Sequence, residues 1–307
     1  MQRSFLGYLV VTLKGIAMGA ADIVPGVSGG TIAFISGIYE ELINSINNIN
    51  FDLLKTLRKE GIAAAWKQAN ANFLVALVAG IGISVISLSK GIGWLLVNQP
   101  ILLWSFFFGL VLASIYFVGK QVTKWNLVVI IALIIFALIA FYITSLPPLS
   151  KTDSLLFLFF AGSLAICAMI LPGVSGAFIL VLLGAYKTIL DAIDNRDFKT
   201  IATVGLGAIF GLLAFSRLLK WLFNHHRDLI LAILTGFILG SLNKIWPWKK
   251  VLETAIIHEK EVILREKSIL PTSFDGDPQL LLAILLMVVG FLTIIILERI
   301  ASTSNKE

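Results

Sequence analysis

The sequence predicts an all-α polytopic membrane protein made of two repeats with inverted topology. First, 58% of the 307 residues are hydrophobic and only 14% are charged, whereas soluble globular domains carry about 25% charged residues. Second, several apolar stretches run for about 20 residues, which is long enough to cross a hydrocarbon core of roughly 30 Å. Third, one short motif occurs twice, which indicates an internal repeat.

The repeated motif is Pro-Gly-Val-Ser-Gly, at residues 25–29 and again at 172–176. When the two copies are aligned, positions further along the chain also agree. For the later positions, about 20 residues that occur only in the first half must be skipped. The matching pairs include Gly37 with Gly184, Tyr39 with Tyr186, Gly80 with Gly207, Trp94 with Trp221 and Gly109 with Gly236. We therefore predict a single transmembrane domain over residues 1–307, with repeat 1 at about 1–150 and repeat 2 at about 151–307.

Each repeat is expected to contain five apolar segments. In repeat 1 they are residues 4–23, 27–46, 71–89, 100–119 and 125–146, and in repeat 2 they are residues 153–171, 174–193, 200–223, 228–246 and 280–297. Because five is odd, repeat 2 enters the membrane upside down relative to repeat 1. If the first two segments form a broken or re-entrant helical hairpin, three transmembrane helices follow and the inverted relation remains. Secondary transporters are commonly built on this plan.

Two segments outside the apolar runs also have a predicted structure. Residues 51–67 place Phe51, Leu54, Ile62 and Trp66 among charged residues, a pattern typical of an amphipathic helix on the inner membrane surface. Residues 247–279 predict a polar extracytoplasmic loop, and loose alternation at 262–270 favours a small strand within it. The single cysteine, Cys167, lies in an apolar segment and excludes an internal disulfide.

The basic residues predict the orientation of the chain. With both termini cytoplasmic, the inner face receives most of the lysines and arginines of the short loops, among them Arg3, Lys55, Lys120 and Arg227. That distribution is what the positive-inside rule requires. The formal net charge of +6 therefore favours contact with anionic lipid over binding of nucleic acid.

A proline–glycine pair opens each copy of the motif, and each pair is expected to stop a helix inside the membrane. The pairs are Pro25–Gly26 and Pro172–Gly173, and the serine that follows each of them can cap a new helix. A helix N-terminus presents free N–H groups and partial positive charge, which suit an anion and especially a phosphate. We therefore predict an anionic head-group site near the membrane midplane, framed by two opposed helix N-termini with Ser28, Gly29, Gly30, Thr31, Ser175 and Gly176. The alternative is that these small residues only let helices pack closely.

Four charged residues in or beside the apolar segments are functional candidates, because charges inside a membrane are costly and usually have a role. Lys14 and Arg217 are expected to help bind the anion, and Arg217 is also a candidate partner for Asp22. Asp22 and Glu40 are expected to bind a proton or cation that is coupled to movement of the anion. Alternatively, Lys14 and Arg217 only extend along their helices toward the membrane interface.

Catalytic and metal chemistry find little support in the sequence. No cluster of histidine, cysteine, aspartate and glutamate has the spacing of metal ligands. No histidine accompanies Ser28 or Ser175 to act as the base for a serine nucleophile. We therefore expect a protein that is not an enzyme and that uses no metal and no cofactor.

Residues 14–43 (KGIAMGAADIVPGVSGGTIAFISGIYEELI) and 171–186 (LPGVSGAFILVLLGAY) together resemble a known family of bacterial and archaeal membrane proteins. That family was long catalogued as a domain of unknown function and was later assigned as polyprenyl-phosphate (undecaprenyl phosphate) translocases. The resemblance covers nearly the whole chain. It implies a protein of the cytoplasmic membrane that returns the phosphorylated lipid carrier from the outer to the inner leaflet, for reuse in cell-envelope synthesis.

The family motif is matched by the first copy of the repeat. The resemblance therefore carries functional expectation onto Asp22, Pro25, Gly26, Ser28, Gly29, Gly30 and Thr31. The second copy departs from the motif, since Met169 stands where Asp22 would be and Ala177 stands where Gly30 would be. This asymmetry puts equal coupling by the two copies in doubt.

Two other functions fit parts of the pattern. An ion or small-anion transporter or channel also uses helix N-termini in inverted repeats. An intramembrane undecaprenyl-diphosphate phosphatase likewise has inverted repeats with a Ser-Gly turn, but its motif adds glutamates and a histidine beside the serine, and both are missing here. The sequence leaves open whether a proton or another cation is coupled, and whether the chain forms a homodimer.

Overall fold

A computed structural model describes residues 3–24, 27–146, 154–257 and 260–304 of the chain. Pro25 and Gly26, the first predicted helix break, lie outside the described residues. The first half contains α1 (Phe5–Ile23), α2 (Gly29–Ile35), α3 (Tyr39–Asn47), α4 (Phe51–Glu60), α5 (Ile62–Gln68), α6 (Ala71–Asn98), α7 (Pro100–Gly119) and α8 (Leu127–Ser145). The second half contains α9 (Leu155–Ile170), α10 (Gly176–Leu182), α11 (Tyr186–Asp194), α12 (Phe198–His225), α13 (Arg227–Ser241), η1 (Leu242–Ile245), β1 (Lys249–Ile257), β2 (Lys260–Ser268), η2 (Pro271–Ser273) and α14 (Leu280–Ser304).

The long helices confirm the prediction of a multi-pass helical membrane protein. Within the described residues, α1, α6, α7, α8, α12, and α13 with η1 are long and apolar enough to cross a membrane. Helices α9 and α14 are apolar but shorter over their described apolar stretches. Helices α10 and α11 meet at a bend of 104°, as in a broken span or a re-entrant loop.

The second predicted segment of each repeat is split into two short helices. Residues 27–46 form α2 and α3, and residues 174–193 form α10 and α11. The matched glycines lie at these splits: Gly37 (φ 73°) between α2 and α3, and Gly184 (φ 67°) between α10 and α11. Because glycine adopts positive φ without a steric penalty, these two residues let the chain leave one helix and turn directly into the next.

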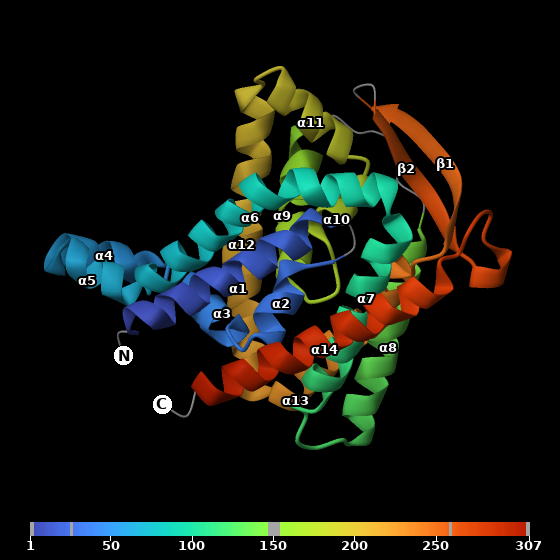
Figure 1. Ribbon diagram of the computed structural model, residues 1–307. Coiled ribbons are helices and arrows are strands. Elements are labelled where there is room, and N and C mark those ends of the chain that lie inside the picture. Colours follow the sequence, from blue (N-terminus) through green and yellow to red (C-terminus); the bar gives the residue numbers. More distant parts are fainter. Residues whose placement is uncertain (1–2, 25–26, 147–153, 258–259, 305–307) are drawn as a thin grey trace.

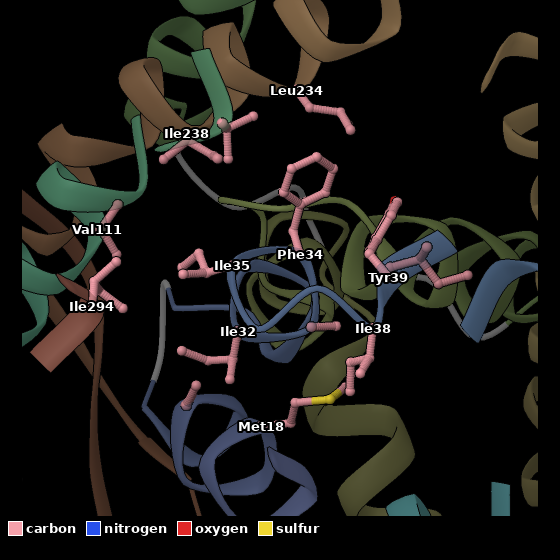
Figure 2. Close-up of a cluster of buried hydrophobic side chains, with 14 of the residues drawn as sticks. Met18, Ile32, Phe34, Ile35, Ile38, Tyr39, Val111, Leu234, Ile238 and Ile294 are labelled. Atoms are coloured by element: carbon pink, nitrogen blue, oxygen red, sulfur yellow. The ribbon is translucent and has the colours of Figure 1, made fainter. Parts of the chain in front are cut away.

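Helix α2 lies at the centre of the molecule. All seven of its residues are buried. Figure 2 shows side chains of α2 between Met18 of α1, which lies below them, and Leu234 and Ile238 of α13, which lie above them. Helices from both halves of the chain therefore enclose α2.

Glycines that the repeat aligns are also points where helices touch. Gly80 brings α6 against α1, Gly207 brings α12 against α9, Gly109 brings α7 against α14, and Gly236 brings α13 against α8. At each of these glycines a β carbon would come well within 3.0 Å of a carbonyl oxygen on the facing helix, a separation that real β carbons essentially never show. The aligned residues thus have equivalent packing roles in the two halves.

The predicted surface helix and the predicted loop both form structure, at opposite ends of the molecule (Figure 1). Residues 51–67 form α4 and α5, which are separated by Gly61 (φ 86°). The loop at 247–279 contains an antiparallel hairpin, β1 with β2, so the strand predicted at 262–270 has a partner that the sequence did not indicate. Trp246 and Trp248 anchor the hairpin, because their indole N–H groups donate to the carbonyl oxygens of Ile269 (2.8 Å) and Pro278 (2.9 Å).

Candidate functional site

The two helix breaks, far apart in the sequence, are hydrogen-bonded to each other. The Ser28 hydroxyl donates to the carbonyl oxygens of Met169 (2.9 Å) and Leu171 (3.2 Å), at the end of α9. In return, the Gly173 N–H donates to Thr31 Oγ1 (2.9 Å). Ser28 and Thr31 are both fully buried. The motif copies therefore form one polar junction inside an apolar bundle.

The N-terminus of α2 is capped by side chains of the same half. Ser28 Oγ accepts a hydrogen bond from the Gly30 N–H (3.1 Å), as predicted for an N-cap serine. Asp22 Oδ1 accepts a second one from the Gly29 N–H (2.7 Å). A β carbon on Gly29 would come within 3.0 Å of the Asp22 carboxylate, so a larger residue here would displace that side chain. A negative charge thus already occupies the positive end of α2.

The opposite end of α2 holds a positive charge. Lys14 Nζ donates to the carbonyl oxygen of Ser36 (2.7 Å), the C-cap residue of α2. Asp22 and Lys14 both come from α1, so one helix neutralises both ends of the α2 dipole. Lys14 is thereby held at the far end of α2 from Ser28.

Glu40 lies in an ion pair between the two halves. Its Oε1 accepts from Arg227 Nη1 (2.6 Å), at the start of α13, and both side chains are about half exposed, at 49% and 48%. The neighbouring Glu41 accepts from both terminal nitrogens of Arg3 (2.6 and 2.5 Å). Two ion pairs therefore tie α3 to other elements, and the predicted coupling residue Glu40 belongs to one of them.

The second break is built with fewer side-chain contacts. Ser175 Oγ accepts from the Phe178 N–H at 3.4 Å, and Gly173 adopts a φ of 85° that favours glycine. A β carbon on Gly176 would collide with the carbonyl oxygen of Ala165 in α9. Gly176 is also the one residue of α10 that is buried, so this half-helix is far more accessible than α2.

Arg217 is not brought to the junction. It is exposed on α12, and within the described residues its guanidinium makes no ion pair with Asp22, whose carboxylate is bonded to Gly29. The predicted site residues thus separate into a group at the junction, a lysine at the far end of α2, and an arginine on the helix surface.

Sequence reasoning missed a charged group beneath the hairpin, which we call the lysine cluster: Lys244, Lys249 and Glu266. Glu266 Oε1 accepts from both lysine ammonium groups, at 2.9 Å each. Burial lowers the pKa of Lys249 to about 8, in spite of the attraction of Glu266. Burial opposes ionisation of Glu266 too, but the two ammonium groups outweigh it and hold the pKa of Glu266 below its ordinary value.

The lysine cluster reaches the second break through an aromatic contact. Lys244 Nζ lies 4.8 Å from the centre of the Phe178 ring in the first turn of α10, and Lys249 Nζ lies 4.4 Å from that of Trp104 in α7. No sequence spacing brings these residues together, because their contact depends on the register of the hairpin.

Comparison with known proteins identifies relatives over nearly the whole chain. Residues 18–263 match the family described as undecaprenyl phosphate translocase-like (VCA0040-like). A protein of Vibrio cholerae serotype O1 named polyprenyl-phosphate transporter is 44% identical over 306 residues, which cover 98% of this chain and 99% of that protein. A protein of Staphylococcus aureus with the same name is 29% identical over 253 residues, which cover 76% of this chain and 85% of that protein.

No solved structure matches the chain. The family match covers most of the sequence, including the helix breaks, the junction residues of both halves and the start of the hairpin. The resemblance noted from the motif is therefore confirmed: the chain belongs to the undecaprenyl phosphate translocase-like family.

Proposed function

We propose that this protein transports polyprenyl phosphate across the cytoplasmic membrane, moving the phosphate head group from the outer to the inner leaflet. The names of the two relatives support the substrate class. The apolar helices of the chain supply surfaces along which an isoprenoid tail can remain in hydrocarbon while the head group crosses.

One observation carries the proposal: the two helix breaks meet at a polar junction, through Ser28 with Met169 and Thr31 with Gly173. Irregular backbone at membrane depth is tolerated where protein or a polar pathway surrounds it. The head group is proposed to cross at this junction, where rearrangement of the contacts would free its hydrogen-bond donors. Those donors belong to Ser28, Gly29, Gly30, Thr31, Ser175 and Gly176.

Asp22 is proposed to couple transport to conformation. A phosphate that approaches the Gly29 N–H meets a carboxylate already bonded there at 2.7 Å. The two anions repel each other and compete for the same donor, so arrival of the head group favours departure or protonation of Asp22. The Glu40–Arg227 ion pair joins the halves at 2.6 Å and is proposed to open and close during the same cycle.

The inverted relation of the two halves, with both termini cytoplasmic, is part of the proposal. The same order of helices in each half supports it, and so do the reciprocal contacts of α7 with α14 and of α8 with α13. Helix α1 begins and α14 ends toward the same side of the molecule in Figure 1. The amphipathic helices α4 and α5 would then lie on the cytoplasmic surface, with the hairpin on the other side.

Hydrolysis is less well supported than transport. A serine nucleophile must give its proton to a base, whereas the Ser28 hydroxyl hydrogen is directed at the backbone carbonyl oxygens of Met169 and Leu171. A transporter of soluble anions needs no path open to lipid, so it would move inorganic phosphate without moving the lipid. The following experiment measures both.

The test is reconstitution of the purified protein in liposomes that contain a chemically trappable polyprenyl phosphate in one leaflet. We expect wild-type protein to accelerate its exchange between leaflets over protein-free liposomes, with no flux of inorganic phosphate and no release of phosphate from polyprenyl diphosphate. Exchange at the protein-free rate, accompanied by flux of inorganic phosphate, would contradict the proposal in favour of a soluble-anion transporter. Release of phosphate from the diphosphate would support the phosphatase.

A further inference from the structure

The lysine cluster holds more positive than negative charge in a nearly dehydrated site. Lys244 and Lys249 share the single carboxylate oxygen Glu266 Oε1. The exposed fractions of the three side chains are 20% for Lys244, 9% for Lys249 and 16% for Glu266. Among the side chains that the structure describes here, two cations and one anion leave a net charge of one positive unit beneath the hairpin.

Such an excess is costly to bury. A charge removed from water needs a paired opposite charge and satisfied hydrogen bonds, and here one carboxylate serves two ammonium groups. Burial lowers the pKa of Lys249, because its pairing with Glu266 offsets only a part of the lost hydration. The rings of Trp104 and Phe178 offset a part of it through their π faces, but an aromatic ring does not carry a full negative charge.

Counting the bonds to described residues, both ammonium groups keep hydrogen-bond capacity for a further partner. An ammonium group has three donors. Lys244 Nζ gives one to Glu266, and Lys249 Nζ gives one to Glu266 and one to the Lys244 carbonyl oxygen. A small anion with several acceptor oxygens would meet these remaining donors and balance the charge.

The place of the cluster connects it with the second helix break. The ammonium group of Lys244 lies over the ring of Phe178, and the backbone N–H of Phe178 is the group that Ser175 caps. An anion held by Lys244 would therefore lie beside the more accessible of the two half-helices. On the other face of β1, the next residue, Lys250, is exposed and faces away from the cluster.

We propose that Lys244 and Lys249 form a phosphate-binding site beneath the β1–β2 hairpin, which receives the head group of the lipid before it reaches the junction of the helix breaks. This inference rests on the proposed transport of polyprenyl phosphate. Inorganic phosphate has the same chemistry and is the other source of such an anion. The Glu266 carboxylate, which accepts from both ammonium groups, is the internal group whose place the phosphate would take.

Binding to the full-length protein in nanodiscs of zwitterionic lipid tests the site. The probes are a short-chain, water-soluble prenyl phosphate, the matching prenyl alcohol and inorganic phosphate, and the measured quantity is Kd by calorimetry. Lys244→Gln and Lys249→Gln should each raise the Kd of the prenyl phosphate by roughly tenfold or more, since each removes a charge-assisted hydrogen bond. The matched control Lys250→Gln should change it by less than about twofold, and the alcohol should bind the three variants and wild type alike.

Glu266→Gln separates a binding site from a purely structural ion pair. Removing the competing carboxylate should lower the Kd of the prenyl phosphate, and the probe should raise the thermal midpoint of this variant more than that of wild type. Folded variants that lose thermal stability with unchanged Kd values would overturn the site. Equal, mutually competitive binding of inorganic and prenyl phosphate would overturn its assignment to the lipid.

The liposome assay distinguishes failure of the site from failure of the proposed function. Unchanged Kd values in the lysine variants, together with lipid exchange by wild type, would reject the site and leave transport standing. Lysine-dependent binding of inorganic phosphate, without lipid exchange by wild type, would reject both lipid transport and the lipid assignment.

Discussion

Helices α2 and α10 begin from the same Pro-Gly-Val-Ser-Gly motif, but the structure treats them differently. All seven residues of α2 are buried, whereas in α10 the buried residue is Gly176. Helix α2 is capped by Ser28 and Asp22 at one end and by Lys14 at the other, whereas α10 has a Ser175 cap at 3.4 Å. A shared motif therefore sets the break, and the surroundings set its accessibility.

The difference originates in the helix that precedes each motif. Asp22 and Lys14 of α1 align with Met169 and Ala161 of α9, so the second half lacks both charges at these positions. Helix α10 instead has Lys244, contributed by the segment that leads into the hairpin, against its first turn. We infer that the first break is the fixed part of the site and that the second is the part a head group reaches first.

The largest effect is expected where α2 touches α9. A β carbon on Gly30 would collide with the backbone carbonyl oxygen of Ile170, which cannot move without displacing the end of α9. Gly30→Ala should lower the free energy of unfolding by about 3 kcal/mol or more, measured by thermal denaturation in detergent. Gly82→Ala in α6, where a β carbon meets open space, is the control and should be neutral or slightly stabilising.

Gly176→Ala sharpens that comparison. Its β carbon meets the carbonyl oxygen of Ala165, but α10 is less enclosed and can shift more easily. We expect a smaller loss than for Gly30→Ala. Equal losses in the two variants would show that the two half-helices are equally fixed.

The buried ammonium group of Lys249 should make stability depend on alkaline pH. The pKa of Lys249 is about 8 in the fold, below its ordinary value of 10.5, so between these values the folded chain binds fewer protons than the unfolded chain. The free energy of unfolding should therefore rise with pH over this window, by at most about 3 kcal/mol. Lys249→Gln should remove this rise in a denaturation series from pH 7.5 to roughly pH 10.5, and an unchanged slope would contradict the buried charge.

The serines should rank in the same order as the glycines. Ser28→Ala removes a helix cap and the buried hydroxyl that donates to two backbone carbonyl oxygens, at a cost of about 2 kcal/mol. Ser175→Ala removes a longer cap on a more accessible helix and should cost about 0.5–1 kcal/mol. Thermal midpoints of the two variants in the same detergent decide the order, and the reverse ranking would refute the asymmetry.

The smallest effect is expected for the ion pair between α3 and α13. Glu40→Gln breaks a pair whose side chains are about half exposed, so its loss should cost no more than about 1 kcal/mol. The difference from wild type should shrink in about 1 M salt, which screens exposed charges. A larger, salt-independent loss would assign Glu40 a role beyond this pair.

Much of the fold could be predicted from the sequence, because long apolar segments and repeated glycines are local signals. The matched glycines Gly37 and Gly184 end the half-helices, and Gly80 and Gly207 mark equivalent helix contacts. The sequence also pointed to both helix breaks and to Asp22, which is in contact with Gly29, seven residues further along the chain.

Long-range contacts could not be predicted in the same way. The bond between Ser28 and Met169 spans 141 residues, and nothing in the motif shows that α2 rather than α10 becomes the centre of the fold. Lys249 and Glu266 are 17 residues apart in the 247–279 segment and meet only when β1 pairs with β2. Arg217 is a candidate for binding the anion by sequence, yet in the structure it is exposed on α12.

The central claim is that the carboxylate-capped junction carries the head group, and the rate of leaflet exchange in Asp22→Asn tests it most directly. Asparagine keeps an acceptor for the Gly29 N–H but has no charge that an arriving phosphate can repel. In liposomes with a trappable polyprenyl phosphate, we expect exchange to be about tenfold slower than in wild type, equivalent to about 1.4 kcal/mol in the barrier. The exposed-site control Lys90→Gln should match wild type. A folded Asp22→Asn variant that exchanges lipid at the wild-type rate would contradict the account.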